Sequence, residues 1–108
     1  MEVRLRTIGG SERFKRQVIA DARHVASVLG LDRLPLITIG GTTRGVDGEM
    51  VSCRGTKNAT VYVRRKPLCA SFRFVLAHEL AHFWQLMHEL PFDEQQADDM
   101  AFKVWGKV

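Results

Sequence analysis

The sequence predicts one α+β domain over residues 1–108, with an N-terminal helix, a small three-stranded sheet and two further helices. Three observations support this fold class. The chain has 108 residues, 45% hydrophobic and 26% charged, which is enough for one small core but leaves no room for a second domain. Apolar residues recur with helical periodicity toward both ends, and short strand-like segments lie between them. No internal repeat or Pro/Gly/Ser-rich linker divides the chain.

The first predicted helix begins at Ser11, whose hydroxyl can cap it, and runs to about Leu29, where Gly30 ends it. Its apolar residues recur every three or four positions, as in an amphipathic helix with one face on the core: Phe14, Val18, Ala22, Val25 and Leu29.

The middle of the chain predicts three short strands. Residues 36–39 (Leu-Ile-Thr-Ile) are typical of a buried strand, and the Gly-rich stretch 40–48 of a loop. Residues 50–53 and 60–64 form two further strand patterns, and Gly55 to Asn58 supply turn residues between them. We therefore expect these two strands to form a hairpin.

Two helices complete the predicted fold. Residues 68 to about 85 are apolar nearly all round, which predicts a helix in the middle of the domain. Pro91 suits the first turn of another helix, which runs to about Trp105.

The central helix carries the pattern His78-Glu79-Leu80-Ala81-His82. Histidines four residues apart lie one turn apart on one helix face, so both imidazoles can bind one metal ion. Glu79 points elsewhere but stays close, where it can take a proton from a metal-bound water. Because the surrounding residues are apolar, these polar groups need partners, and a metal satisfies all of them.

A third ligand is predicted on the last helix. If the two C-terminal helices pack antiparallel, one register places Glu94 opposite His82 and Asp98 opposite His78. Glu94 would then bind the metal, and Asp98 would accept the free ring N–H of His78 and orient the imidazole. The competing interpretation of both acids is a solvated helix face, because acids are common in this stretch.

Two other third ligands remain open from the residues alone. His88 lies six residues after His82, as in the H-E-x-x-H-x-x-G-x-x-H spacing, but Gln85 stands where that motif has its glycine. Cys53 is a further possibility, because a Cys-His-His set also holds zinc.

At these residues the sequence resembles a gluzincin-type zinc metallopeptidase, of the ImmA/IrrE-like or minimal single-domain kind. The resemblance covers His78 to His82 and then Glu94, Ala97 and Asp98, as H-E-x-x-H followed by E-x-x-A-D. It implies a zincin-like minimal domain with an active-site helix and a C-terminal ligand helix. It also implies zinc on His78, His82 and Glu94, with Glu79 as general base and Asp98 as the orienting acid.

The resemblance further implies a protein or peptide substrate, which pairs with an edge strand of the sheet. Thr60-Val61-Tyr62-Val63 is the expected counterpart, so Val61, Tyr62 and Val63 are candidate substrate-binding residues. In the expected reaction, zinc polarises the scissile carbonyl, Glu79 deprotonates the bound water, and the protonated Glu79 then donates to the leaving amine.

The charge distribution keeps a different function open. Residues 1–66 have a net charge of +7 and residues 67–108 of −3. A basic half can bind nucleic acid or an acidic partner, although charge alone specifies no site. The alternatives are therefore a non-catalytic zinc-containing module that binds a partner or nucleic acid, and a SprT-like DNA-associated protease if His88 is the third ligand.

The sequence also predicts a cytoplasmic protein without a membrane span. No apolar run approaches the roughly 20 residues that a span needs, and the N-terminus has no apolar signal-peptide core. Two cysteines, Cys53 and Cys69, are too few for a disulfide framework, so we expect free thiols.

Overall fold

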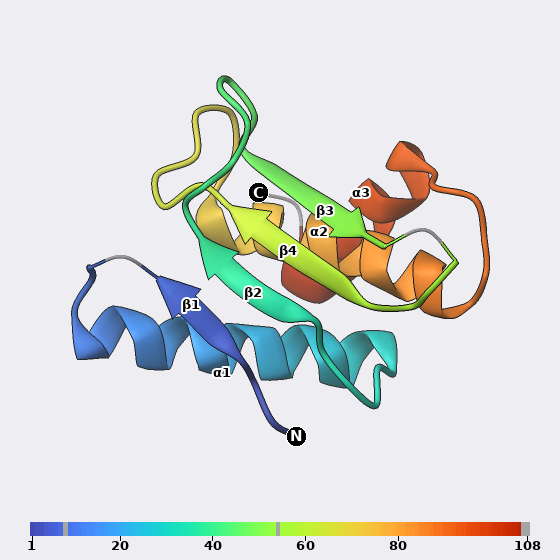
Figure 1. The fold of residues 1–108 in the computed structure, drawn as a ribbon, viewed down its shortest axis with the longest axis horizontal. Helices are drawn as coiled ribbons and strands as arrows, with labels where there is room; N and C mark the ends of the chain where they lie inside the picture. The colour runs from blue at the N-terminus through green and yellow to red at the C-terminus, as the bar shows by residue number, and fades with distance from the viewer. Residues whose placement is uncertain (8, 54, 107–108) are drawn as a thin grey trace.

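A computed structural model describes residues 1–7, 9–53 and 55–106 and has an α+β architecture, as predicted. Three helices pack on one side of a four-stranded mixed sheet (Figure 1). In chain order the elements are β1 (Leu5–Thr7), α1 (Glu12–Leu29), β2 (Leu36–Ile39), β3 (Gly48–Ser52), β4 (Ala59–Val63), α2 (Phe72–Met87) and α3 (Glu94–Trp105).

The sheet has the strand order β1-β2-β4-β3. Strand β2 pairs in parallel with both β1 and β4, whereas β3 and β4 form the predicted antiparallel hairpin. Strand β1 was not predicted. Its three residues are too few to show a period of two, and it becomes a strand because it can pair with β2.

The prediction that residues 60–63 form an edge strand is wrong. Strand β4 lies between β2 and β3, and Val61 and Val63 are fully buried on the helix-covered side. Parallel pairing with β2, a contact between segments far apart in the sequence, is what places β4 inside the sheet. The edge nearest α2 is instead β3, which contacts that helix directly.

Helix α1 begins and ends as predicted. The Ser11 side chain accepts a hydrogen bond from the Phe14 backbone N–H at 3.1 Å, and Gly30 ends the helix in the left-handed conformation (φ 71°). Val18, Ala22 and Val25 are at most 1% exposed, so the amphipathic face packs into the core.

Helix α2 lies in the middle of the molecule but begins four residues later than predicted. Its cap is Ser71, whose side chain accepts from the Phe74 backbone N–H at 3.2 Å. The backbone N–H groups of Leu68 and Cys69 donate instead to the Asp47 carboxylate, at 2.7 and 2.8 Å. This tertiary contact holds the preceding segment as a loop beside β3.

Helix α3 begins at Glu94, so the prediction that Pro91 occupies its first turn is wrong. The side chain of Asp93 caps the helix by accepting from the Gln96 backbone N–H at 3.1 Å, which leaves Pro91 in the loop. Helix α2 ends just before in a tight turn. There Glu89 has a positive φ of 57°, and the Leu90 N–H bonds to the Gln85 carbonyl at 2.9 Å.

We expect Glu89→Gly to stabilise the fold by roughly 0.5–1 kcal/mol, because glycine adopts positive φ without the strain of a Cβ. Urea unfolding measures the change. Glu89→Ala is the matched control, since it removes the exposed Glu89–Lys57 ion pair (3.6 Å) but keeps the strained Cβ. Equal stability of the two variants would contradict the explanation.

None of the helices in the described ranges combines the length and apolar character needed to cross a membrane.

Candidate metal centre

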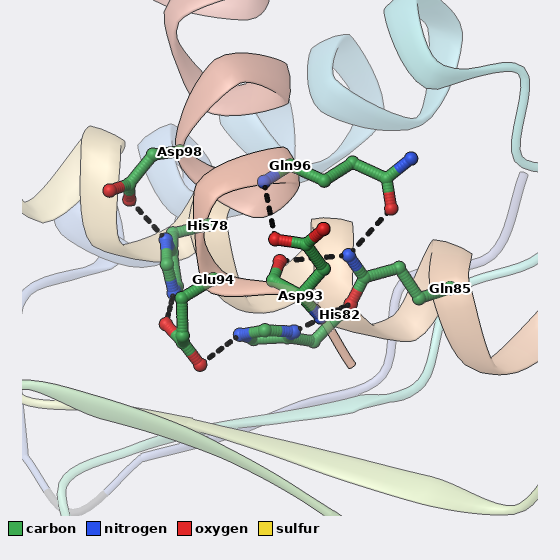
Figure 2. A network of polar contacts seen from close by, with 7 residues as sticks. All are labelled: His78, His82, Gln85, Asp93, Glu94, Gln96 and Asp98. Carbon is green, nitrogen blue, oxygen red and sulfur yellow. Dashed lines mark hydrogen bonds and ion pairs between the residues drawn. The ribbon is translucent and has the colours of Figure 1, made fainter. Parts of the chain in front are cut away.

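Three of the predicted metal-binding side chains converge at one point between α2 and α3. His78 and His82 lie one turn apart on α2, and Glu94 is the first residue of α3. One Glu94 carboxylate oxygen is 2.9 Å from His78 Nε2, and the other is 2.9 Å from His82 Nε2. All three ligand atoms lie within 4.8 Å of one another (Figure 2).

The predicted helix register is confirmed by two contacts at once. Glu94 meets His82, and Asp98 Oδ1 lies 2.7 Å from His78 Nδ1. The turn at residues 88–90 reverses the chain soon enough for α3 to return along α2 in this register. Asp98 is therefore placed to accept a hydrogen bond from the ring nitrogen of His78 that faces away from Glu94.

Gln85 performs the same task for His82, a role that the sequence pattern does not indicate. Its side chain is fully buried, and its Oε1 lies 2.8 Å from His82 Nδ1. The orientation of the amide is determined by its other contacts: Nε2 donates to the Asp93 carbonyl (3.0 Å) and to Gln96 Oε1 (2.8 Å), and Oε1 accepts the Asp93 N–H (3.3 Å). Nδ1 of His82 therefore donates to Gln85, and its Nε2 faces Glu94 (Figure 2); in the neutral ring this Nε2 carries the lone pair.

The hydrogen-bond pattern fits a bound cation. Both nitrogens of His78 face carboxylate oxygens, and both nitrogens of His82 face acceptor oxygens. When the two imidazoles are neutral, each donates from one nitrogen only, and the two Nε2 lone pairs then oppose the oxygens of Glu94. A metal ion among these atoms removes the conflict, and two imidazoles with one carboxylate are a donor set of catalytic zinc.

Glu79 stands beside this cluster but does not belong to it. Its side chain lines the same cleft and is only 6% exposed. Burial raises the pKa of Glu79 to about 7; the charges of His78 and His82 oppose this rise, and those of Glu94 and Glu49 add to it. A carboxyl group with a pKa near neutrality can both accept and donate a proton, which suits general acid–base catalysis.

Strand β3 packs closely on Glu79 because residue 48 is a glycine. A Cβ at Gly48 would lie 2.6 Å from Val75 Cγ1 and 2.9 Å from Glu79 Cγ, closer than real atoms approach. The sequence pattern predicts Gly48 in a loop, whereas it is the first residue of β3. A glycine next to a strand pattern is a signal of such a close approach, although it does not name the partner.

The buried state of Glu79 predicts a pH dependence of stability in the metal-free protein. Because the pKa is about 7 in the folded state against 4.5 ordinarily, the folded protein binds this proton more tightly than the unfolded chain. The free energy of unfolding should therefore fall as the pH rises from about 4.5 to about 7, by roughly 3 kcal/mol at most.

Comparing metal-free wild type with Glu79→Gln by urea unfolding across this pH range isolates the contribution of Glu79. The variant should become progressively more stable relative to wild type as the pH rises. A difference in stability that does not change with pH would contradict the assignment.

The cleft at this site has a volume of about 440 Å³ and lies between β3 and the two C-terminal helices. Gly48, Glu49 and Met50 of β3 form one wall, and Phe92 of the α2–α3 loop lies against His82, with ring centroids 5.5 Å apart. The metal cluster and Glu79 are both on this cleft, so a bound molecule can contact both.

The other predicted site residues lie elsewhere. His88 caps the end of α2, where its Nδ1 lies 2.8 Å from the Trp84 carbonyl oxygen and its ring stacks on Trp84. Cys53 and Cys69 are free and exposed thiols, as expected. Within the described part of the chain, none of His88, Cys53, Val61, Tyr62 and Val63 lines the cleft. Tyr62 and Cys53 instead border a second pocket.

We expect Gln85→Leu to lower zinc affinity by about 10- to 100-fold, because it removes the group that orients His82 and the acceptor of the Asp93 N–H. Competitive titration with a chromogenic chelator measures the affinity. Gln95→Leu is the matched control, because Gln95 bonds to Asp99 on the exposed side of α3. Equal effects of the two substitutions would show that Gln85 does not act through His82.

Comparison with protein-family models, with curated proteins and with solved structures gives no match, so the function has to be inferred from the geometry of this site.

Proposed function

We propose that this protein is a zinc-dependent metallopeptidase of the gluzincin type, which hydrolyses peptide bonds. His78, His82 and Glu94 hold the zinc, and Glu79 is the general base. One observation carries the proposal: two imidazole nitrogens and a carboxylate converge on the same cleft as a buried carboxyl group that is not one of the ligands. A purely structural site has no need of that fourth group.

The residues of this chain divide the chemistry between them. Zinc at this site would supply a Lewis acid that polarises the scissile carbonyl. Asp98 and Gln85 hold the two imidazoles so that their Nε2 lone pairs point to the metal position. Glu79 takes a proton from the attacking water and transfers it to the leaving amine as the C–N bond breaks. Burial of Glu79 stabilises the protonated form that the second transfer requires.

The free edge of β3 is the proposed place for the peptide backbone, in place of residues 60–63. The Arg64 N–H bonds to the Asp47 carbonyl, and the Cys53 N–H bonds to the Asn58 carbonyl. These two pairs flank β3 and continue its register, and on the β3 side both involve odd-numbered residues. The odd-numbered residues within β3 therefore also direct their backbone groups toward β4. In an antiparallel pair the alternate residues point outward. Gly48 and Met50 therefore direct their N–H and C=O groups away from β4, where an extended peptide can pair with them beside the zinc site.

The proposal is tested on the purified full chain. We expect one zinc per chain and hydrolysis of an unfolded polypeptide such as reduced casein, lost on treatment with 1,10-phenanthroline and restored by added zinc. Bound zinc without hydrolysis of casein or of a diverse peptide library would favour the non-catalytic module. Failure to bind zinc would overturn the proposal altogether.

A further inference from the structure

One face of the sheet has no helix packed on it. The helices cover the side to which the fully buried Ile37 and Val61 turn, and the opposite face is open (Figure 1). Because side chains alternate along a strand, the residues next to these point to the open face. Leu36, Thr60 and Val51 form one row there, across β2, β4 and β3.

A pocket separate from the metal cleft hollows one end of this open face. It has a volume of about 340 Å³ and lies where β2 and β4 begin and β3 ends. Leu36, Val51 and Tyr62 give it apolar and aromatic surface. None of the described residues that line this pocket also lines the metal cleft, so the two can bind different molecules.

The charged side chains of this pocket are all cationic. Arg4 precedes β1, Arg33 lies in the loop between α1 and β2, and Lys57 lies in the β3–β4 turn. Within the described ranges of the chain, no acidic residue lines the pocket. Cations from three separate segments therefore meet over one hollow, which attracts anions.

The two arginines of the pocket keep their charge available. No ion pair to Arg4 or Arg33 is found among the residues that the structure describes. Arg33 Nη2 donates to the Lys57 carbonyl at 3.3 Å, a neutral contact that positions the guanidinium. Lys57 itself lies 3.6 Å from the exposed Glu89 carboxylate, so part of its charge is already paired. Arg4 and Arg33 are thus the cations that a bound anion would meet.

We propose that this pocket binds a single-stranded nucleic acid, with phosphates on Arg4 and Arg33 and a base on the partly exposed ring of Tyr62. Arginine presents a planar fork of donors that matches phosphate oxygens. The Tyr62 ring and the apolar floor suit an unpaired base, whereas a duplex keeps its bases inside its own stack. The net positive charge of residues 1–66 adds a general attraction for a polyanion.

The position of the pocket argues against an acidic peptide as its ligand. Added peptide strands bind at sheet edges, where backbone N–H and C=O groups are free. Strands β2 and β4 lie inside the sheet and are paired on both sides, so the pocket offers mainly side chains. Charge and stacking are then the available interactions, and single-stranded nucleic acids are bound by both.

The test measures fluorescence anisotropy of a labelled single strand of about 12 nucleotides, made as DNA and as RNA, with the purified full chain. At least one of the two should bind more tightly than its duplex and than a polyglutamate peptide of equal charge. The logarithm of the binding constant should fall linearly with the logarithm of the salt concentration. Arg4→Gln and Arg33→Gln should each reduce that slope by about 0.7. Tyr62→Leu, which keeps an apolar side chain, should weaken binding about tenfold.

Arg13→Gln is the matched control, because Arg13 is an exposed arginine of α1 outside this pocket. It makes the same change in net charge and should leave the slope nearly unchanged. Urea unfolding of each variant separates a lost contact from a lost fold. Arg4→Gln should keep its zinc and its hydrolysis of casein, and Glu79→Gln should bind the oligonucleotide as the wild type does. Failure of either proposal can therefore be distinguished from failure of the other.

Four results would overturn the inference. Equal losses in Arg13→Gln and Arg4→Gln would show attraction by net charge alone. Tighter binding of the duplex would mean that no unpaired base is held, and tighter binding of polyglutamate would make the partner an acidic protein. The fourth result is that neither single strand binds.

Discussion

Replacing Glu79 by Gln is expected to reduce peptide hydrolysis by roughly 10²- to 10⁴-fold while zinc stays bound at the wild-type stoichiometry. The amide has the size of the carboxylate and fits beneath Gly48, but it cannot accept the proton of the attacking water. Because Glu79 lies outside the cluster of ligand atoms, the metal should not be affected. Hydrolysis of a quenched fluorescent peptide and metal analysis of the same sample measure the two quantities.

Glu89→Gln is the control for this experiment, since it makes the same change at an exposed glutamate on the α2–α3 turn. It should retain both activity and zinc. If Glu79→Gln lost zinc as well as activity, Glu79 would be a ligand or a structural anchor. If the variant hydrolysed peptides at the wild-type rate, it would not be the base.

The second large effect concerns the acids of α3. Glu94→Ala should lose more zinc affinity than the roughly 10- to 100-fold expected for Asp98→Ala, because Glu94 touches both imidazoles whereas Asp98 only orients His78. His88→Ala should have little effect, since its ring nitrogen bonds to a backbone carbonyl and its ring stacks on Trp84.

Titration of zinc into the three variants ranks the three residues directly. A large loss in His88→Ala together with a small loss in Glu94→Ala would replace the His-His-Glu site by a three-histidine site. Circular dichroism of the metal-free proteins separates loss of a ligand from loss of the fold, because all three positions are at least partly exposed and tolerate a smaller side chain.

Much of the site could be predicted from the sequence because it depends on local geometry. The spacing of His78 and His82 sets both imidazoles on one helix face whatever surrounds the helix. The short link to α3 then allows few registers, and the one that pairs Glu94 with His82 also pairs Asp98 with His78. The cap of α1 at Ser11 depends on one side chain and a backbone group three residues away.

The remaining features required contacts between distant segments. Strand β1 forms because it pairs with β2. Strand β4 lies inside the sheet because β2 and β3 pair with its two edges. In the sequence Gln85 departs from a spacing motif, and it becomes an orienting group only when Asp93 and Gln96 fold back against it.

The sequence by itself determined the α+β class, the amphipathic first helix and the residues of the candidate centre, because periodicity, capping and helix spacing act over a few residues. Only the tertiary structure decided that β3 is the edge strand beside the cleft, that Gly48 lets it cover Glu79, and that Gln85 orients His82. Strand order and burial follow from long-range pairing and packing, which no local pattern encodes.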